Sequence, residues 1–252
     1  EQSYPKDGRI ANNIIINNKA FTEPVITEDS NSRVLPWLRQ HALNSKGKGW
    51  FAAGYGAFRR LTRRSQILVP SLQQPLRYTN FISQINENEP LSVFEQWMVY
   101  LDFRIAKNPK DKIANNQMKM GIAAINKLLP EGSSFDSISS DGKVWFDVAG
   151  QKVSTVGLSD GYRSIMALAG DLVWRLIEAF PDSLAPLEEL GTVILDELDI
   201  HLHPVWQRNI ASQLRNLFPN IQFIVATHSP LIAAGAGEEA VTYRFINNDG
   251  KT

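Results

Sequence analysis

Short apolar runs in this chain have the composition of buried β-strands. Residues Thr192–Leu195 are β-branched or aliphatic, and Ile221–Val225 is apolar apart from Gln222. A third run, Trp50–Phe58, contains two glycines, which favour close approach of other backbone. Continuous runs of this length are typical of strands covered on both faces, as in a parallel sheet. We therefore expect Thr192–Leu195 to be a strand buried on both faces.

Other stretches repeat apolar residues at helical spacing. The segment after Leu158 predicts a helix that begins at Ser159 and Asp160. The same periodicity predicts two or three helices between residues 79 and 129, broken near Asn108-Pro109, and one helix after Pro204. The apolar positions that support the first helix are Ile165, Leu168, Ala169, Leu172, Val173, Leu176 and Phe180.

Turn signals add antiparallel strands. We expect hairpins at Ile14–Phe21 and across Phe135–Val148, and a last strand at Val241–Ile246. In the second hairpin, Asp141-Gly142 between Phe135–Ser139 and Val144–Val148 is the turn signal.

Composition and charge narrow the class of protein. The 252 residues are 43% hydrophobic, enough to bury a sizeable core in one large domain or one domain with an inserted lobe. The balance of 26 basic and 26 acidic residues argues against a broadly cationic nucleic-acid surface. The absence of Cys excludes disulfides and thiol-ligated metals and fits a cytosolic protein. No long apolar run or leader is visible, so we expect no membrane span.

Ionisable residues stand where the predicted strands end. Asp196 and Glu197 follow one strand, and His228 follows the next strand along the chain. Ligands of open α/β sheets bind at the carboxyl ends of the strands, and carboxylates there must be hydrated, paired or metal-bound. An apolar strand ending in Asp-Glu has the form of a Walker B segment.

A second candidate site lies at the start of the helix after Leu158. Helix N-terminal N–H groups and the helix dipole attract anions, and Gly161 permits close backbone approach. Ser159 and Asp160 also suit an ordinary helix cap followed by a turn glycine, so this alternative stays open.

Taken together, these motifs resemble those of ABC-type ATPases. Leu158–Tyr162 is similar to the signature motif, Thr192–Glu197 followed by His201–Pro204 to the Walker B segment and D-loop, and Phe223–Pro230 to the switch-histidine motif. The likeness is greatest to the soluble branch containing SMC, RecF and OLD-type proteins. Within it, the chain most resembles stand-alone ATPases of bacterial anti-phage systems, of the Septu and retron-associated kind.

This resemblance implies an α/β fold, the ABC-ATPase head of the P-loop NTPases. Such a head has a mixed or parallel central sheet with flanking helices, an antiparallel β subdomain and an inserted helical lobe. We accordingly expect a β-rich part of the first ATPase lobe at residues 1–75 and the helical lobe at 76–135. The ATPase core with the signature, Walker B, D-loop and switch histidine would then occupy residues 136–252.

The resemblance also implies roles for the site residues. Asp196 would hold Mg²⁺, Glu197 would polarise the attacking water, and His228 would contact the γ-phosphate of ATP. In a head-to-tail homodimer, each subunit would cap the ATP that the other holds. The residues expected to face nucleotide are Ser159, Asp160, Gly161, Asp199 and His203.

The D-loop region contains a histidine pair, His201 and His203. For this pair we favour packing of the loop over metal binding, because no third ligand is evident nearby.

A phosphate cradle of the form G-x-x-x-x-G-K-[ST] is missing from the 252 residues. Gly250-Lys251-Thr252 lacks the first glycine, and Gly47-Lys48 is followed by Gly49. The resemblance therefore implies a C-terminal part of an ATPase whose Walker A loop lies upstream, and we expect this part to be inactive alone.

The function implied by the resemblance is that of an Mg²⁺-dependent cytoplasmic ATPase. Its ATP-dependent dimerisation would control a partner effector, a nuclease, in anti-phage defence. Two alternatives remain open: a RecF- or SMC-like DNA repair ATPase, and a non-hydrolysing ATP-gated scaffold. The basic cluster Arg59–Arg64 could contact DNA, although a solvated loop is the favoured interpretation.

Overall fold

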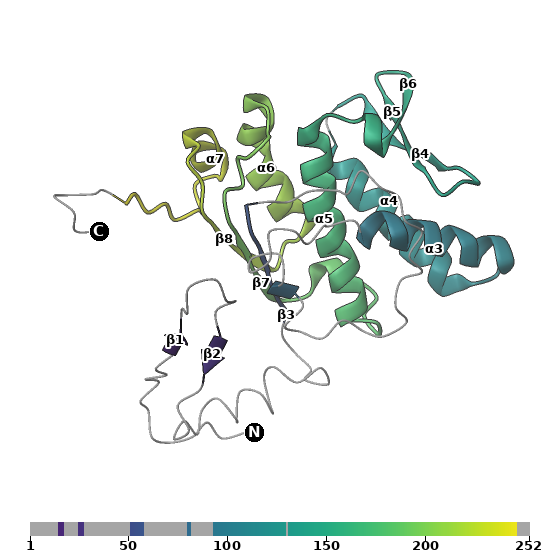
Figure 1. Ribbon diagram of the computed structural model, residues 1–252, viewed down its shortest axis with the longest axis horizontal. Helices are drawn as coiled ribbons and strands as arrows, with labels where there is room; N and C mark the ends of the chain where they lie inside the picture. Colours follow the sequence, from purple (N-terminus) through teal and green to yellow (C-terminus); the bar gives the residue numbers. More distant parts are fainter. Residues whose placement is uncertain are drawn as a thin grey trace. The chain divides into compact units, whose positions relative to one another are not determined.

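The computed structural model describes residues 15–17, 25–27, 51–57, 80–81, 93–129 and 131–245 (Figure 1). Three segments that the sequence singles out lie outside this range: Arg59–Arg64, Gly47-Lys48 and Gly250-Lys251-Thr252. None of the helices in the described part is long and apolar enough to cross a membrane.

The chain divides into two compact units, residues 1–49 with 76–78, and residues 50–75 with 79–252. In the first unit, β1 (Ile15–Asn17) and β2 (Val25–Thr27) pair antiparallel. An antiparallel strand pair is thus confirmed, but the predicted bounds Ile14–Phe21 are wrong, because the second strand is Val25–Thr27.

The larger unit is built around a three-stranded parallel sheet. Its order is β3 (Phe51–Tyr55), β7 (Gly191–Leu195) and β8 (Ile221–Val225). The register aligns Tyr55 with Leu195 and Leu195 with Val225, so all three strands end at one edge. The strands predicted from the apolar runs are confirmed.

One face of this sheet is buried and the other is partly open. Val193 and Leu195 are 0% and 1% exposed, whereas Ile194 between them is 38% exposed. Ile224, which pairs with Ile194 on β8, is 51% exposed. The expectation that Thr192–Leu195 is buried on both faces is therefore wrong among the described residues. An apolar run indicates that side chains can be buried, but it does not show which faces are covered.

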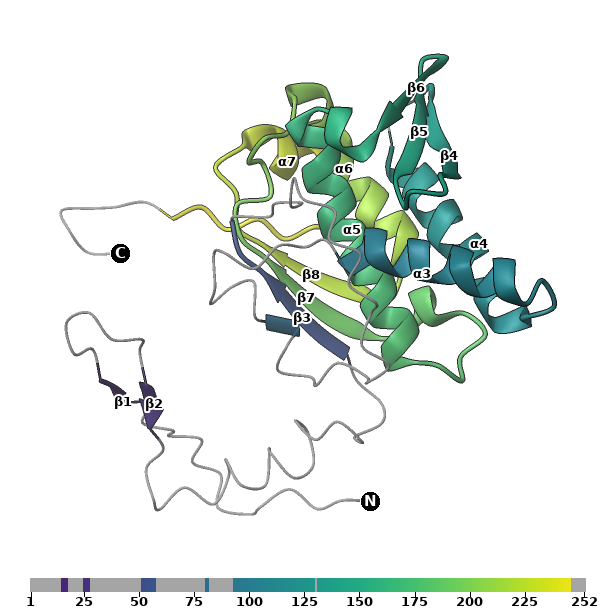
Figure 2. The same ribbon diagram turned by 45° about the vertical axis from the view of Figure 1, so that its right-hand side comes forward.

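Two helices cover the buried face (Figure 2). α5 (Asp160–Ala179) packs against β3, and η3 (Pro186–Glu188) leads from α5 to β7. α6 (Pro204–Leu217) is followed by Phe218, whose ring centroid lies 6.2 Å from that of Phe223 in β8. Both helices begin where the sequence predicts.

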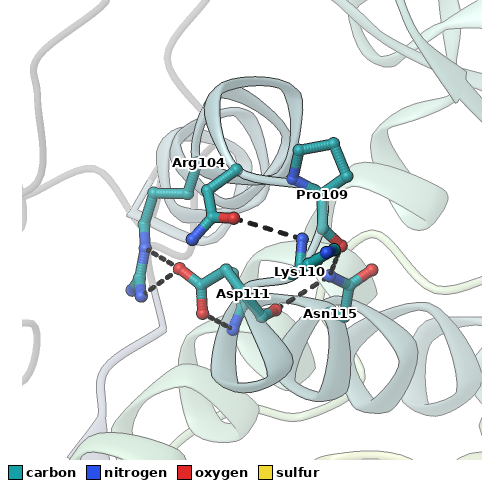
Figure 3. Close-up of polar contacts among 7 residues, drawn as sticks. Arg104, Pro109, Lys110, Asp111 and Asn115 are labelled. Atoms are coloured by element: carbon teal, nitrogen blue, oxygen red, sulfur yellow. Dashed lines mark hydrogen bonds and ion pairs between the residues drawn. The ribbon is translucent and has the colours of Figure 1, made fainter.

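A helical hairpin packs on α5. It consists of α3 (Val93–Lys107) and α4 (Lys112–Leu128), and the break at Asn108-Pro109 is confirmed. Arg104 donates hydrogen bonds of 2.6 and 3.1 Å to one carboxylate oxygen of Asp111 (Figure 3). The other oxygen accepts a backbone N–H in the first turn of α4, so one aspartate both caps α4 and closes the turn.

A second sheet lies between α4 and α5 in the sequence. β4 (Ser133–Ile138), β5 (Val144–Val148) and β6 (Gln151–Ser154) are antiparallel in that order. The predicted hairpin is confirmed: the N–H of Gly142 donates to the carbonyl of Ser139 at 2.8 Å, so Ser140 and Asp141 are the central residues of the turn, and Gly142 follows them with a φ of 75°. β6 was not anticipated; it leads through η2 (Thr155–Gly157) to α5.

The end of the described chain differs from expectation. After β8 comes α7 (Pro230–Gly235), but residues 241–245 form no strand. Val241, Tyr243 and Phe245 alternate as in a strand, yet they are 76%, 79% and 91% exposed. The prediction of a last strand here is wrong in the described part, because alternation also needs a neighbouring sheet edge with which to pair. The α/β fold class, with parallel sheet, flanking helices, antiparallel sheet and helical hairpin, is confirmed.

Candidate functional site

The parallel sheet brings the predicted catalytic residues to one edge. The backbone N–H of Asp196 donates to the carbonyl of Tyr55 at 2.9 Å, and that of Ala226 donates to Leu195 at 2.8 Å. The chain after β7 then returns to β8, where the N–H of Leu198 donates to Ala226 at 3.2 Å. These bonds place the two carboxylates after β7 beside the Thr227–Ser229 segment after β8.

Glu197 and His228 face each other at this edge. Oε1 of Glu197 lies 3.9 Å from Nε2 of His228, and the two side chains are 37% and 87% exposed. Glu197 has a φ of 45°, in the left-handed region that costs a non-glycine residue roughly 1–3 kcal/mol. Such conformations are concentrated at functional sites because the surrounding structure must hold them. Asp196, one residue earlier, is exposed.

Asp199 holds the two loops together. Its Oδ1 accepts a short hydrogen bond from the Thr227 hydroxyl and one of 3.2 Å from the backbone N–H of His228. Burial acts to raise the pKa of Asp199, but these hydrogen bonds outweigh it, so its pKa lies below the usual value. Its carboxylate, predicted to face nucleotide, is thus directed at the segment after β8.

The histidine pair serves the local structure of the loop. Nδ1 of His203 accepts the backbone N–H of Val205 at 3.4 Å and caps α6, and His201 has a φ of 66°. No group of three or more His, Asp or Glu residues that could hold a metal occurs among the described residues. The cap made by His203 supports loop packing for that residue; for His201 loop packing stays a prediction.

The start of α5 has an unused hydroxyl. Ser159 is the N-cap residue, but its exposed side chain makes no capping hydrogen bond. Asp160 is also exposed and lies 3.4 Å from Nη1 of Arg163. A capping serine would normally bond the helix N–H groups. The side chain of Ser159 and the first turn of α5 therefore remain available to an anion.

Gly161 is required by packing within the subunit. A Cβ here would lie 2.9 Å from the carbonyl oxygen of His201 and 3.3 Å from the Trp206 ring. The next residue, Tyr162, stacks edge-on against Trp206 with centroids 4.5 Å apart. The start of α5 thus lies directly on the loop after β7 and the start of α6. The close approach that the sequence predicts at Gly161 is observed, but its partner is protein backbone.

The sequence analysis did not identify Gln207 or a buried cluster around Asp171. Gln207 on α6 forms hydrogen bonds with both loops of the site. Its only signal in the sequence is its place one turn after the His203-Pro204 cap. Beneath the sheet, the hydroxyl of Tyr55 and the guanidinium of Arg175 both donate to Asp171. The spacing of four residues between Asp171 and Arg175 on a predicted helix could have suggested this ion pair.

The cation that Asp196 could hold at this edge of the sheet is Mg²⁺. It takes oxygen ligands and is usually held by one or two carboxylates together with substrate phosphates. A single exposed carboxylate, Asp196, suits a metal that arrives with nucleotide. With Glu197 and His228 beside it, the arrangement can orient and deprotonate a water molecule next to a metal-bound phosphate.

The chain is similar to several known proteins. A family model described as "AAA domain, putative AbiEii toxin, Type IV TA system" matches residues 39–234. The "Retron Vc95 probable ATPase" of Vibrio cholerae serotype O1 biovar El Tor is 44% identical over 98 residues, 39% of this chain and 19% of that protein. The "Septu protein PtuA" of Bacillus mycoides strain KBAB4 is 42% identical over 107 residues, 39% of this chain and 14% of that protein.

A solved structure from work on ATP-driven dimerisation and DNA-stimulated activation of SMC ATPases is 18% identical. It gives a TM-score of 0.40 over 60% of this chain and 85% of that chain. The matches to the retron and Septu proteins span a fifth or less of each relative. Because the family model matches far more than half of the 252 residues, the chain belongs to the AAA-domain family that this model describes.

Proposed function

We propose that this chain supplies the hydrolytic carboxylates of an Mg²⁺-dependent ATPase. The observation that carries the proposal is the meeting of Asp196, Glu197 and His228 at the carboxyl edge of one parallel sheet. A named relative is a probable ATPase. The proposal concerns the whole protein, since the relatives are much longer than the part that this chain matches.

Each residue has a task that its position allows. Glu197 accepts a proton from the attacking water, and its left-handed backbone directs it toward His228. His228 donates a hydrogen bond to the terminal phosphate. Asp196 holds the metal, which supplies charge neutralisation for the phosphate oxygens.

The test is phosphate release by the full-length protein under single-turnover conditions, with Mg²⁺ and with EDTA. We expect release that needs the metal. Binding of ATP without any release would contradict hydrolysis and favour the ATP-gated scaffold.

We further propose that ATP joins two copies head to tail, with Ser159 facing the nucleotide held by the other copy. The support is the exposed hydroxyl of Ser159, which its own helix does not use. Gly161 lies against the backbone of His201, so a movement of the α5 N-terminus on dimerisation would also displace the D-loop of the same subunit.

Replacing Ser159 by Arg should block ATP-dependent dimerisation while each subunit folds and binds nucleotide. A long cation would fill the space that a small hydroxyl leaves for a phosphate. Sedimentation velocity with and without ATP measures the effect. Leu184→Arg, at a side chain that is 97% exposed, is the control for adding an arginine. A Ser159→Arg protein that still dimerises with ATP would place Ser159 away from the dimer interface.

We also propose that ATP-dependent dimerisation controls a partner effector, a nuclease, in anti-phage defence. The likeness to retron and Septu proteins supports this. We expect the full-length protein, purified from its native operon, to retain a neighbouring gene product whose activity changes with ATP. A protein that purifies alone and ignores its neighbours would favour a RecF-like role on DNA instead.

A further inference from the structure

Four residues of the site form a closed ring of hydrogen bonds. Nε2 of Gln207 donates to the carbonyl of Asp199 at 3.4 Å, and the Asp199 carboxylate accepts from the Thr227 hydroxyl. The Thr227 oxygen accepts the backbone N–H of Ser229 at 3.0 Å. The Ser229 hydroxyl closes the ring by donating to Oε1 of Gln207 at 2.6 Å. The ring joins α6, the loop after β7 and the segment after β8.

The direction of every bond at Gln207 is determined. Its Nε2 also donates to the carbonyl of Leu202 at 2.9 Å, and carbonyls only accept, so the amide cannot be reversed. The Ser229 hydroxyl accepts the backbone N–H of Leu231 at 3.2 Å, which leaves its hydrogen for Gln207. A single side chain thus satisfies three partners in two loops.

The ring surrounds the backbone of the residues that need accurate placement. His228 lies between Thr227 and Ser229, and Glu197 lies two residues before Asp199. The His228 side chain is 87% exposed, so packing cannot hold it. Its separation from Glu197 must therefore be set by the backbone on either side, which the ring fixes.

The Asp199 carboxylate joins the loop after β7 to Thr227, but this bond does not attach either loop to a helix. Gln207 attaches both loops to α6, a helix whose residues Ile210 and Leu214 are buried. Ser229, itself only 9% exposed, offers its hydroxyl to Gln207 in a place that water reaches poorly. Loss of the amide would therefore leave polar groups without partners, and the loops would shift to recover them.

We propose that Gln207 is a positioning residue for hydrolysis. It sets the distance between Glu197 and His228 by tying their two loops to α6, and it touches neither ATP nor metal. The inference deepens the proposed function and rests on it for its effect on turnover, although the ring itself can be tested without ATP.

The first experiment replaces Gln207 by Met, which keeps the length of the side chain and removes its three hydrogen bonds. Because misplacement by an ångström can cost about 10²-fold in rate, we expect kcat to fall by roughly that factor in the full-length protein. KM for ATP should stay near the parent value. Gln213→Met on the same helix is the matched control, since within the described part of the chain the Gln213 side chain makes no hydrogen bond.

Hydrogen exchange separates this inference from the proposed function. The amides of His228, Ser229 and Leu231 donate to ring members, so their exchange should accelerate in Gln207→Met and not in Gln213→Met. If exchange is faster in Gln207→Met but the parent protein does not hydrolyse ATP, the proposed ATPase function is wrong, while the conclusion that Gln207 holds the two loops still stands. Unchanged exchange together with parent-like kcat would overturn the role of Gln207.

Gln207→Glu gives a second test that a purely structural role would not pass. A protonated carboxyl can donate to the Leu202 carbonyl and accept from Ser229, whereas the ionised form only accepts. The rate of Gln207→Glu relative to the parent should therefore rise as the pH falls toward the ordinary Glu pKa of about 4.3. The ratio for Gln207→Met should stay flat. A flat ratio for both variants would contradict the proposal.

Discussion

Replacing Glu197 by Gln in the full-length protein lowers the rate of ATP hydrolysis by about 10²–10⁴-fold, the usual effect of losing a general base. The amide keeps the size of the side chain but cannot take a proton from water at neutral pH. ATP should still bind, because the phosphate and metal contacts lie elsewhere. Steady-state phosphate release and equilibrium titration with a fluorescent ATP analogue measure the two effects separately.

Glu188→Gln is the matched control, because Glu188 is exposed and lies outside the site. It should hydrolyse ATP at the parent rate. Glu197 would be removed from the mechanism by turnover within about threefold of the parent, a change worth less than 1 kcal/mol of barrier.

Local patterns predicted most of the element order. Pro204 at the first position of α6, the break at Asn108-Pro109 and the Asp141-Gly142 turn each act through their own backbone, so the structure confirms them. The edge that collects Asp196 and His228 follows from parallel strands alone. These features need no knowledge of distant contacts.

Features that depend on distant partners were not predictable. Ile194 belongs to an apolar run, but its exposure depends on which layer covers that face of the sheet. Gly161 suggested room for a phosphate, whereas its observed neighbour is the carbonyl of His201, forty residues later. Residues 241–245 carry a strand pattern without a paired edge among the described residues.

The candidate site shows the same division. The meeting of Glu197 and His228 could be predicted, because they lie two and three residues after neighbouring parallel strands. Gln207 could not, since its three partners come from loops whose approach to α6 is a property of the fold. Tyr55 and Asp171 are 116 residues apart, and nothing near either residue indicates that they meet.

Replacing Asp171 by Ala is expected to destabilise the larger unit by about 3–5 kcal/mol, the usual cost of removing one partner of a buried ion pair. Asp171 is 0% exposed and accepts Nε of Arg175 at 2.6 Å and the hydroxyl of Tyr55 at 2.9 Å. The alanine leaves the buried guanidinium without its counter-charge. Asn80 would remain as its partner, at 2.8 Å, but an amide does not neutralise it.

The Tyr55 phenol adds a dependence on pH. Burial, followed by the charge of Asp171, holds the pKa of Tyr55 well above its usual value of 10.0. A folded-state pKa that is raised contributes stability that is fully present below the unfolded pKa and lost as the pH rises through the folded one. Stability of the parent should therefore decline above about pH 10, and Tyr55→Phe should weaken that decline.

Urea unfolding followed by tryptophan fluorescence measures this loss; one of the six tryptophans, Trp174, has its ring centre 5.4 Å from the Arg175 guanidinium. Asp102→Ala, at an exposed position of α3, should leave the midpoint unchanged. Replacing the pair together, Asp171→Leu with Arg175→Met, should recover part of the loss, since it leaves no uncompensated charge, although the Tyr55 hydroxyl and the Asn80 amide lose these partners. If the single and double variants are equally unstable, the loss comes from packing and the ion-pair argument fails. Because the carbonyl of Tyr55 accepts the N–H of Asp196, loosening of this cluster should also reach the edge of the sheet where hydrolysis is proposed.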